Sequence, residues 1–340
     1  MKKRLFPLFF VAAMSLTACG QKSYSPSDYM LELDYTGTFK ILQLTDTHIS
    51  DKDDQDLHYA FLETLIKDAN KNNDVNLIVI TGDLFTFAGK TTARKYFDFF
   101  DKQGIPWTVV FGNHDEQTYF SVEWMTKQLN QRNYKRLQDH SSCCVFHDYE
   151  DDSVRGNCNF AINLKKGGAV TDQLIMMDSN RYNFGGYFGY DYFKENQIKW
   201  YEKLVEETAN TFNSGNPVNS LMFYHIPLFE INDAYEKGTV IYDGRNGVGD
   251  GRREDCCPPK TNSGFFTTIV SKGSTKAMFF GHDHVNTFEA DYEGVKFCYG
   301  IKSTNRIYYD EDLLGYQTIE IKDDHSLEIV RSFHTYSEVE

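Results

Sequence analysis

Clusters of Asp, Asn and His residues recur along the chain after short apolar runs, and these residue types can bind metal ions. In chain order the clusters are Asp46-Thr47-His48, Gly82-Asp83, Gly112-Asn113-His114-Asp115, His225 and Gly281-His282-Asp283-His284. A mixture of carboxylate, amide and imidazole ligands suits manganese, iron or zinc rather than calcium. Each cluster alone is compatible with an ordinary turn, but their recurrence predicts a metal centre.

The apolar runs that precede the clusters have the length of β-strands. They cover residues 39–45, 77–81, 107–111, 220–224 and 275–280. Helical patterns at residues 56–71 and 91–103 separate the first three runs, which predicts βαβ units and a largely parallel sheet. Open sheets of this kind bind ligands beyond the carboxyl ends of their strands, so we expect the clusters to meet there.

Three later segments complete the organisation. An apolar stripe predicts a helix over residues 194–213. Short β-like runs alternate with turns from residue 286 to 333, which predicts an antiparallel end to a second sheet. Residues 230–261 form a connection rich in glycine and proline. This connection is longer than a simple connecting loop in a compact domain, so we expect it to line one wall of the site.

The ordered clusters resemble the signature of the calcineurin-like metallophosphoesterases, which is D-x-H, G-D, G-N-H-D, a lone His and G-H-x-H. The resemblance extends from about residue 39 to residue 321. His225-Ile226-Pro227-Leu228 and residues 262–266 are similar to the branch related to purple acid phosphatases. The resemblance implies one α/β domain over residues 38–333, built as a two-sheet sandwich flanked by helices.

The resemblance also implies two metal ions, each with its own ligands and with Asp83 bridging both. The ligands of the first ion would be Asp46, His48 and His284. The ligands of the second ion would be Asn113, His225 and His282. Two such ions activate a hydroxide and stabilise the entering and leaving oxygens of a phosphoryl group.

The implied reaction is hydrolysis of a phosphomonoester by attack of a metal-bridging hydroxide. A phosphodiesterase or nucleotidase with the same site is the first alternative, and a non-catalytic surface-binding lipoprotein is the second. In the family, the residue matching His114 donates a proton to the leaving group or contacts the phosphate, and Asp115 would orient it. Arg181 is a candidate phosphate-binding residue, with a salt bridge as the alternative.

One position departs from the purple acid phosphatases. Thr86 stands where those enzymes carry the tyrosine that binds ferric iron and gives the purple colour. A purple iron-tyrosinate centre is therefore not expected. Histidines outside the clusters are expected to have surface or hydrogen-bonded roles; they are His58, His140, His147, His325 and His334.

Residues 1–18 have the pattern of a secretory signal peptide, with basic residues, an apolar run and small residues before Cys19. The apolar run is shorter than the roughly 20 residues that cross a bilayer, which disfavours an uncleaved transmembrane anchor. Residues 16–19 resemble a bacterial lipobox, in which Cys19 would carry the lipid. We therefore expect an exported, membrane-anchored lipoprotein facing the periplasm or cell surface, with residues 19–37 as a lipidated tether.

Charge and cysteine content add two further expectations. The formal net charge is −14, and loss of the three basic residues of the signal segment makes it −17. Such a charge argues against nonspecific nucleic-acid binding, while two divalent ions would attract a phosphate ester locally. Disulfides are possible in an exported chain, but the sequence does not determine a pairing among Cys143, Cys144, Cys158, Cys256, Cys257 and Cys298.

Overall fold

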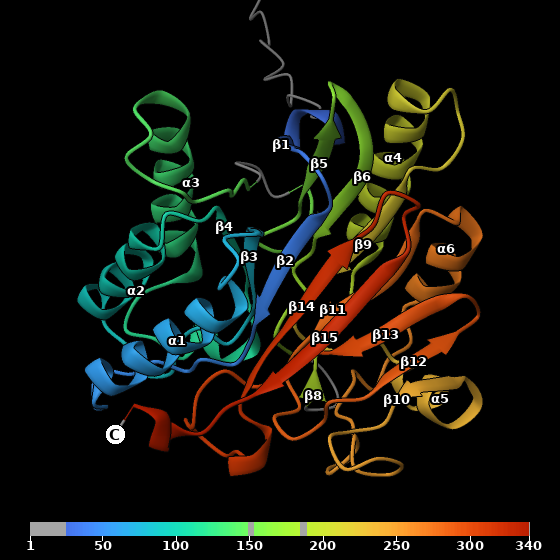
Figure 1. Cartoon of the computed structure of the whole chain (residues 1–340). Coiled ribbons are helices and arrows are strands. Elements are labelled where there is room, and N and C mark those ends of the chain that lie inside the picture. The colour runs from blue at the N-terminus through green and yellow to red at the C-terminus, as the bar shows by residue number, and fades with distance from the viewer. Residues whose placement is uncertain (1–24, 149–152, 184–188, 340) are drawn as a thin grey trace, which may run out of the picture.

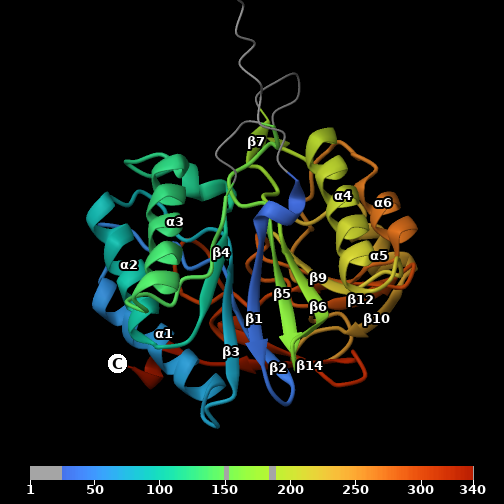
Figure 2. The ribbon, with the colours of Figure 1, turned by 90° about the horizontal axis from the view of Figure 1, so that it is seen from above.

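Two β-sheets lie face to face between two layers of helices in the computed structural model (Figures 1 and 2). The structure describes residues 25–148, 153–183 and 189–339. The predicted signal peptide and Cys19 lie outside the described residues. Within the described residues, no helix has the length and apolarity needed to cross a membrane. The predicted α/β sandwich with flanking helices is confirmed.

The five-stranded sheet has the order β15-β14-β2-β3-β4. Its parallel part consists of β2 (Phe39–Leu44), β3 (Val75–Thr81) and β4 (Trp107–Val110). The hairpin of β14 (Gly315–Ile321) and β15 (Leu327–Phe333) adds to β2 in antiparallel orientation. α1 (Gln55–Ala69) and α2 (Lys90–Lys102) connect the parallel strands, as predicted, and lie with α3 (Val122–Gln138) on the outer face (Figure 2).

The eight-stranded sheet has the order β1-β5-β6-β9-β11-β13-β12-β10. Its strands are β1 (Met30–Tyr35), β5 (Phe160–Lys166), β6 (Ala169–Met176), β9 (Asn219–Phe223), β10 (Thr239–Tyr242), β11 (Thr275–Phe280), β12 (Glu289–Tyr292) and β13 (Val295–Tyr299). β6, β9, β11 and β13 are parallel neighbours in this order. The outer face carries α4 (Glu195–Phe212), α5 (Ile231–Lys237) and α6 (Phe265–Lys272) (Figure 2). A separate two-stranded ribbon consists of β7 (Tyr182–Asn183) and β8 (Gly189–Tyr190).

The side-chain spacing of α2 explains how a helix joins this fold. Ala93, Tyr96, Phe97 and Phe100 recur at helical spacing and are fully buried. Tyr96 and Phe97 make ring contacts with other buried aromatic side chains, which anchor the helix to the sheet. Burial of such side chains stabilises the fold by roughly 1.5 to 3 kcal/mol each.

Two sequence predictions about chain organisation are wrong. The segment from residue 286 to 333 does not finish a single sheet, because β12 and β13 join the eight-stranded sheet whereas β14 and β15 join the five-stranded sheet. Residues 19–37 are not a tether throughout, because β1 pairs in parallel with β5 from Met30 to Tyr35. The alternating half-buried pattern of β1 is typical of a strand at the edge of a sheet.

Candidate metal centre

The predicted ligands follow five strands from both sheets. Asp46, Asp83 and Asn113 come after β2, β3 and β4 of the five-stranded sheet. His225 and the His282-Asp283-His284 turn come after β9 and β11 of the eight-stranded sheet. All seven predicted ligands are buried. The sandwich therefore brings together residues that are up to 238 positions apart, from Asp46 to His284.

The residues expected around the first ion form a compact group. Ligand atoms of Asp46, His48, Asp83 and His284 all lie within 4.8 Å of one another. The Nε2 atoms of His48 and His284 are 3.0 Å apart, and His284 Nε2 lies 3.3 Å from Asp46 Oδ1. Four donor atoms directed at one small volume are the arrangement that a metal ion requires.

Asp83 connects this group to the residues expected around the second ion. Its Oδ2 atom lies 3.5 Å from His48 Nε2 and 3.2 Å from His225 Nε2. The His225 and His282 rings meet edge to face, with centroids 5.3 Å apart. The carboxylate of Asp83 thus lies between the two ligand sets, as the bridging role requires.

Several donor atoms at the centre have no hydrogen-bond partner in the described structure. They are Asp46 Oδ1, Asn113 Oδ1, His225 Nε2 and His282 Nε2, and each is buried. An unsatisfied buried polar atom costs about 1 to 3 kcal/mol, so four of them among the seven predicted ligands need an explanation. Each of these atoms carries a lone pair that can coordinate a metal ion. The residues present therefore fit the two ions that the fold implies.

Hydrogen bonds direct three of the four imidazole rings toward the centre. Each of these rings uses Nδ1 for a protein partner: His48 for the Thr86 hydroxyl at 2.8 Å, His225 for the Thr81 carbonyl oxygen at 2.7 Å, and His284 for the Tyr308 carbonyl oxygen at 2.8 Å. The Nε2 atoms are left facing the carboxylates. Metal-binding histidines are typically oriented in this way.

The backbone at the centre is strained. Asp46, His48, Asp83 and His282 have φ angles of 53°, 46°, 50° and 80°, in the left-handed region. Residues other than glycine rarely adopt this backbone conformation, and they keep it only where the surrounding structure imposes it. Gly112 permits the close packing, because a Cβ atom there would collide with the Asp83 carboxylate. Four of the seven predicted ligands share this conformation, which indicates a functional constraint.

Burial and neighbouring charges shift the pKa values of side chains at the centre. Burial alone would raise the pKa of Asp83, but the neighbouring His225 and His48 hold it well below its usual value. Burial lowers the pKa of His282 to about 3, so this imidazole stays neutral and can bind a cation. Burial also lowers the pKa of Lys302 to about 7, and its Nζ donates to the Asp46 carbonyl oxygen at 2.9 Å.

His114 lies beside the centre but is not oriented by Asp115, so that prediction is wrong. The Nδ1 atom of His114 pairs with Gln117 Oε1 at 2.8 Å. The Asp115 carboxylate instead accepts hydrogen bonds from the backbone N–H groups of Gly112, Leu84 and Phe85. Asp115 therefore holds the Asp83 and Asn113 turns together rather than acting on the imidazole.

Arg181 forms a salt bridge, which was the alternative to phosphate binding that the sequence left open. Its guanidinium makes an ion pair with Glu116 and donates a hydrogen bond to Asn157 Oδ1 at 3.1 Å. The neighbouring Tyr182 is closer to the centre, because its hydroxyl accepts a 2.9 Å hydrogen bond from Asn113 Nδ2. The arginine is thus engaged by protein groups.

Part of the 230–261 connection lies against the His282-Asp283-His284 turn. The backbone N–H of Cys257 donates to Asp283 Oδ2 at 3.2 Å, and Glu254 Oε1 accepts from the N–H of Val285 at 3.0 Å. This contact agrees with the expected wall of the site. The first part of the connection is not loop, since it forms α5 and β10.

The remaining candidate residues have ordinary partners. His58, His325 and His334 form hydrogen bonds with Tyr336, Asp172 and Glu338. All six cysteines of the described residues have free thiols.

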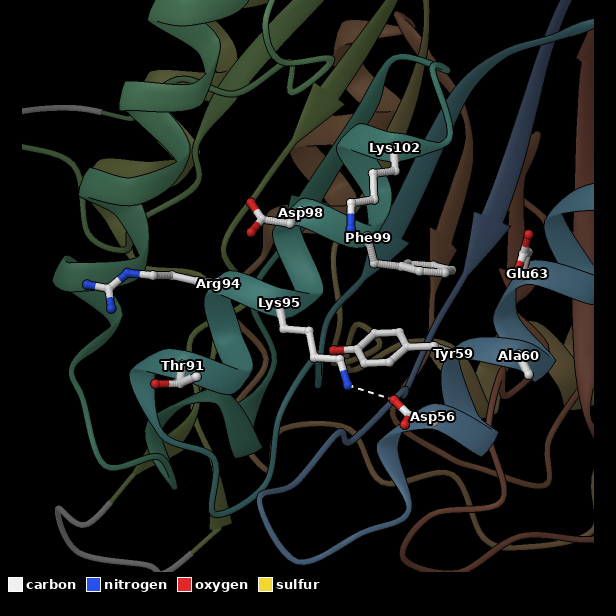
Figure 3. Close-up of a pocket in the computed structure, with 10 residues that line it drawn as sticks. All are labelled: Asp56, Tyr59, Ala60, Glu63, Thr91, Arg94, Lys95, Asp98, Phe99 and Lys102. Atoms are coloured by element: carbon white, nitrogen blue, oxygen red, sulfur yellow. Dashed lines mark hydrogen bonds and ion pairs between the residues drawn. The ribbon is translucent and has the colours of Figure 1, made fainter.

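A cavity of about 640 Å³ lies between α1 and α2, where Lys95 and Asp56 form an ion pair beside Tyr59 (Figure 3). None of the residues that line this cavity is a predicted ligand.

Sequence reasoning missed several residues that contact the centre. Thr86 was noted only for what it replaces, yet its hydroxyl orients His48. Lys302 and Tyr308 follow no recognisable motif, and they reach the centre through contacts between distant parts of the chain. Tyr182 and Tyr190 belong to an aromatic run that the sequence does show.

Comparisons with known proteins agree with this geometry. Residues 39–286 match the family model of calcineurin-like phosphoesterases. "Probable inactive purple acid phosphatase 29" of Arabidopsis thaliana is 30% identical, over 79% of this chain and 73% of that protein. "Phosphatase DCR2" of Saccharomyces cerevisiae is 28% identical over 78% of this chain and 48% of that protein.

The fold resembles a solved dimetal phosphatase from Danio rerio, with a TM-score of 0.51, 12% identity and coverage of 87% of this chain and 96% of that one. GAP50 of Plasmodium has the same TM-score at 13% identity, over 90% of this chain and 87% of that one. These structural likenesses concern the fold, whereas the family match extends over most of the chain and includes every motif up to His284. The chain belongs to the calcineurin-like phosphoesterase family.

Proposed function

We propose that this protein is a dinuclear metal-dependent phosphomonoesterase. The observation that carries the proposal is that four predicted ligands have a buried donor atom without a hydrogen-bond partner, namely Asp46 Oδ1, Asn113 Oδ1, His225 Nε2 and His282 Nε2. Manganese, iron and zinc suit such a set of oxygen and nitrogen ligands. Two bound ions would supply positive charge to the phosphoryl oxygens and acidify water.

The protein's own contribution is to position the reacting groups. His114 is the candidate proton donor to the leaving oxygen. The amide oxygen of Gln117 can only accept a hydrogen bond, so Nδ1 of His114 must carry a proton in that contact. Nε2 is then the nitrogen that remains for the substrate, and it can donate to the leaving oxygen when it carries the second proton of the ring. The backbone N–H of His114 donates to Asp83 Oδ1 at 2.8 Å, which fixes the histidine beside the bridging carboxylate.

The names of two Arabidopsis relatives include the word inactive, and that description belongs to those proteins. Loss of catalysis in such a fold is most simply achieved by loss of a ligand. In this chain all seven ligand positions carry a residue able to bind a metal ion, and all seven are buried. This completeness supports a catalytic role over a purely binding one.

Hydrolysis of p-nitrophenyl phosphate and of its bis ester by one metal-loaded preparation tests the proposal. We expect the monoester to be hydrolysed with the higher kcat/KM, and Asp83→Asn to be inactive on both esters. A preference for the bis ester would indicate a phosphodiesterase. Absence of hydrolysis with two metal ions bound would indicate a non-catalytic binding protein.

We also propose that the protein is exported and anchored to a membrane through a lipid on Cys19. The support for this proposal is the sequence pattern of residues 1–19 alone. Metabolic labelling with a radioactive fatty acid tests it, because Cys19→Ala should abolish both the label and the membrane-bound fraction. Labelling that persists in Cys19→Ala would refute the anchor.

A further inference from the structure

Three tyrosines contact three different predicted metal ligands. The Tyr182 hydroxyl accepts a hydrogen bond from Asn113. The Tyr190 ring meets His282 edge to face, with centroids 4.3 Å apart and an interplanar angle of 88°. The Tyr308 ring is stacked on His284, with centroids 4.1 Å apart and an angle of 18°. Aromatic side chains therefore adjoin the metal centre at three of its predicted ligands.

Tyr308 has fixed hydrogen-bond partners, while the residue remains partly accessible to solvent. Its hydroxyl donates to Glu254 Oε1 at 3.2 Å, and its carbonyl oxygen accepts from His284 Nδ1. Even so, the residue is 46% exposed. The preceding Ile307 has a φ angle of 65°, a conformation that a β-branched residue strongly disfavours. The backbone is thus constrained at the point where it presents the ring beside the metal centre.

Tyr182 and Tyr190 provide a second aromatic surface, on the side of the ligands of the second ion. Their rings are stacked with centroids 5.8 Å apart and an interplanar angle of 29°, and both residues are half-buried. Tyr190 contacts His282 and Tyr308 contacts His284, two residues further along one turn. Tyrosine rings therefore contact two histidines of this turn, His282 and His284.

The nearby arginines are already neutralised by carboxylates. Arg181 pairs with Glu116, beside Tyr182. Arg253 pairs with Asp250 and Asp310, and Arg306 pairs with Asp53, all at 2.6 Å. A second phosphate group on the substrate would have to compete with these carboxylates for an arginine. The pairing of these three arginines agrees with a substrate that carries a single phosphate.

We propose that Tyr308, together with Tyr182 and Tyr190, binds the leaving group, and that the substrates are monophosphate esters of flat, aromatic alcohols. This inference rests on the phosphomonoesterase activity proposed above. An aromatic ring placed against tyrosine gains stacking energy that an aliphatic chain of similar polarity does not. These tyrosines are specificity determinants, while the metal ligands carry the reaction.

Benzyl phosphate and ethyl phosphate provide the test, because both release aliphatic alcohols and differ chiefly in the aromatic ring. We expect metal-loaded enzyme to favour benzyl phosphate in kcat/KM by roughly 2- to 12-fold, the range that one aromatic pair provides. Tyr308→Ala should lower the benzyl-to-ethyl ratio of kcat/KM toward 1, because KM should rise more for benzyl phosphate than for ethyl phosphate. Tyr308→Phe, which keeps the ring, should retain the preference for benzyl phosphate. Tyr134→Ala, at an exposed position on α3, is the matched control.

Binding of the corresponding phosphonates gives a readout independent of turnover. Calorimetry should show that the wild type binds benzylphosphonate more tightly than ethylphosphonate. Tyr308→Ala should bind the two phosphonates with equal affinity. The metal content of both proteins should be the same. Equal use of both esters by the wild type, or an equal loss for both in Tyr308→Ala, would overturn the inference while the phosphatase function stands. Hydrolysis of neither ester would overturn both proposals.

Discussion

The Thr86 hydroxyl lies 2.8 Å from His48 Nδ1, while Nε2 of the same ring faces the carboxylates of Asp46 and Asp83. In purple acid phosphatases a tyrosine at this position binds ferric iron. In this chain the position is Thr86, which instead orients the metal-ligand candidate His48. Loss of such a contact typically weakens metal binding 10- to 100-fold.

Thr86→Val should therefore weaken metal binding by roughly 10- to 100-fold, because valine has the shape of threonine but no hydroxyl. Competition with a calibrated chelator measures the affinity. Thr86→Ser keeps the hydroxyl and should bind nearly as tightly as the wild type. Equal affinity in Thr86→Val and the wild type would show that the hydrogen bond does not position His48.

His114→Ala should lower kcat by roughly 10²- to 10⁴-fold, the usual contribution of a positioned proton donor. The metal content should stay at the wild-type level, because His114 is not among the predicted ligands. Steady-state kinetics and elemental analysis of the same preparation check both statements. His140→Ala is the control, since His140 is an exposed histidine outside the centre. Parallel loss of metal and activity would make His114 a ligand.

Asp115→Ala should destabilise the fold rather than alter proton transfer. The carboxylate accepts hydrogen bonds from three buried backbone N–H groups at 2.8, 2.9 and 3.1 Å. Leaving these donors without a partner should cost on the order of 3 kcal/mol or more in the free energy of unfolding. Urea denaturation of the metal-free protein measures the change. A loss below about 1 kcal/mol would contradict the structural role.

The stability of the protein should fall below neutral pH partly because of His58. Burial lowers the pKa of His58 to about 4, so the folded state binds this proton less readily than the unfolded state does. The resulting stabilisation is complete above the usual histidine pKa of about 6.5 and is lost as the pH falls from there toward 4. His58→Gln should show a shallower decline in melting temperature over this interval. Identical declines would rule out the contribution.

Much of the centre could be predicted because its ligands lie directly after apolar strands. A run such as residues 77–81 needs only its own composition to be recognised, and the carboxyl ends of parallel strands meet at one edge. The sequence predicted less well which strands belong to which sheet. β14 pairs with β2 across more than 270 positions, and no local pattern specifies such a partner.

The contacts around the ligands could not be predicted for a similar reason. Lys302 reaches Asp46 through a side chain that enters a buried space created by both sheets. Tyr308 orients His284 through its carbonyl oxygen, a group that every residue carries. The role expected for Asp115 failed because proximity in sequence to His114 does not determine where a carboxylate points. Gln117, one helical turn from His114, occupies that place.

The central claim is that two metal ions bind among seven buried side chains. Inductively coupled plasma mass spectrometry of protein loaded with Mn²⁺ or Zn²⁺ and freed of excess metal measures the stoichiometry directly. We predict two ions per chain for the wild type and fewer for Asp83→Asn, which removes the charge between the two ligand sets. Retention of no ion by the wild type, or of two ions by both proteins, would contradict the account.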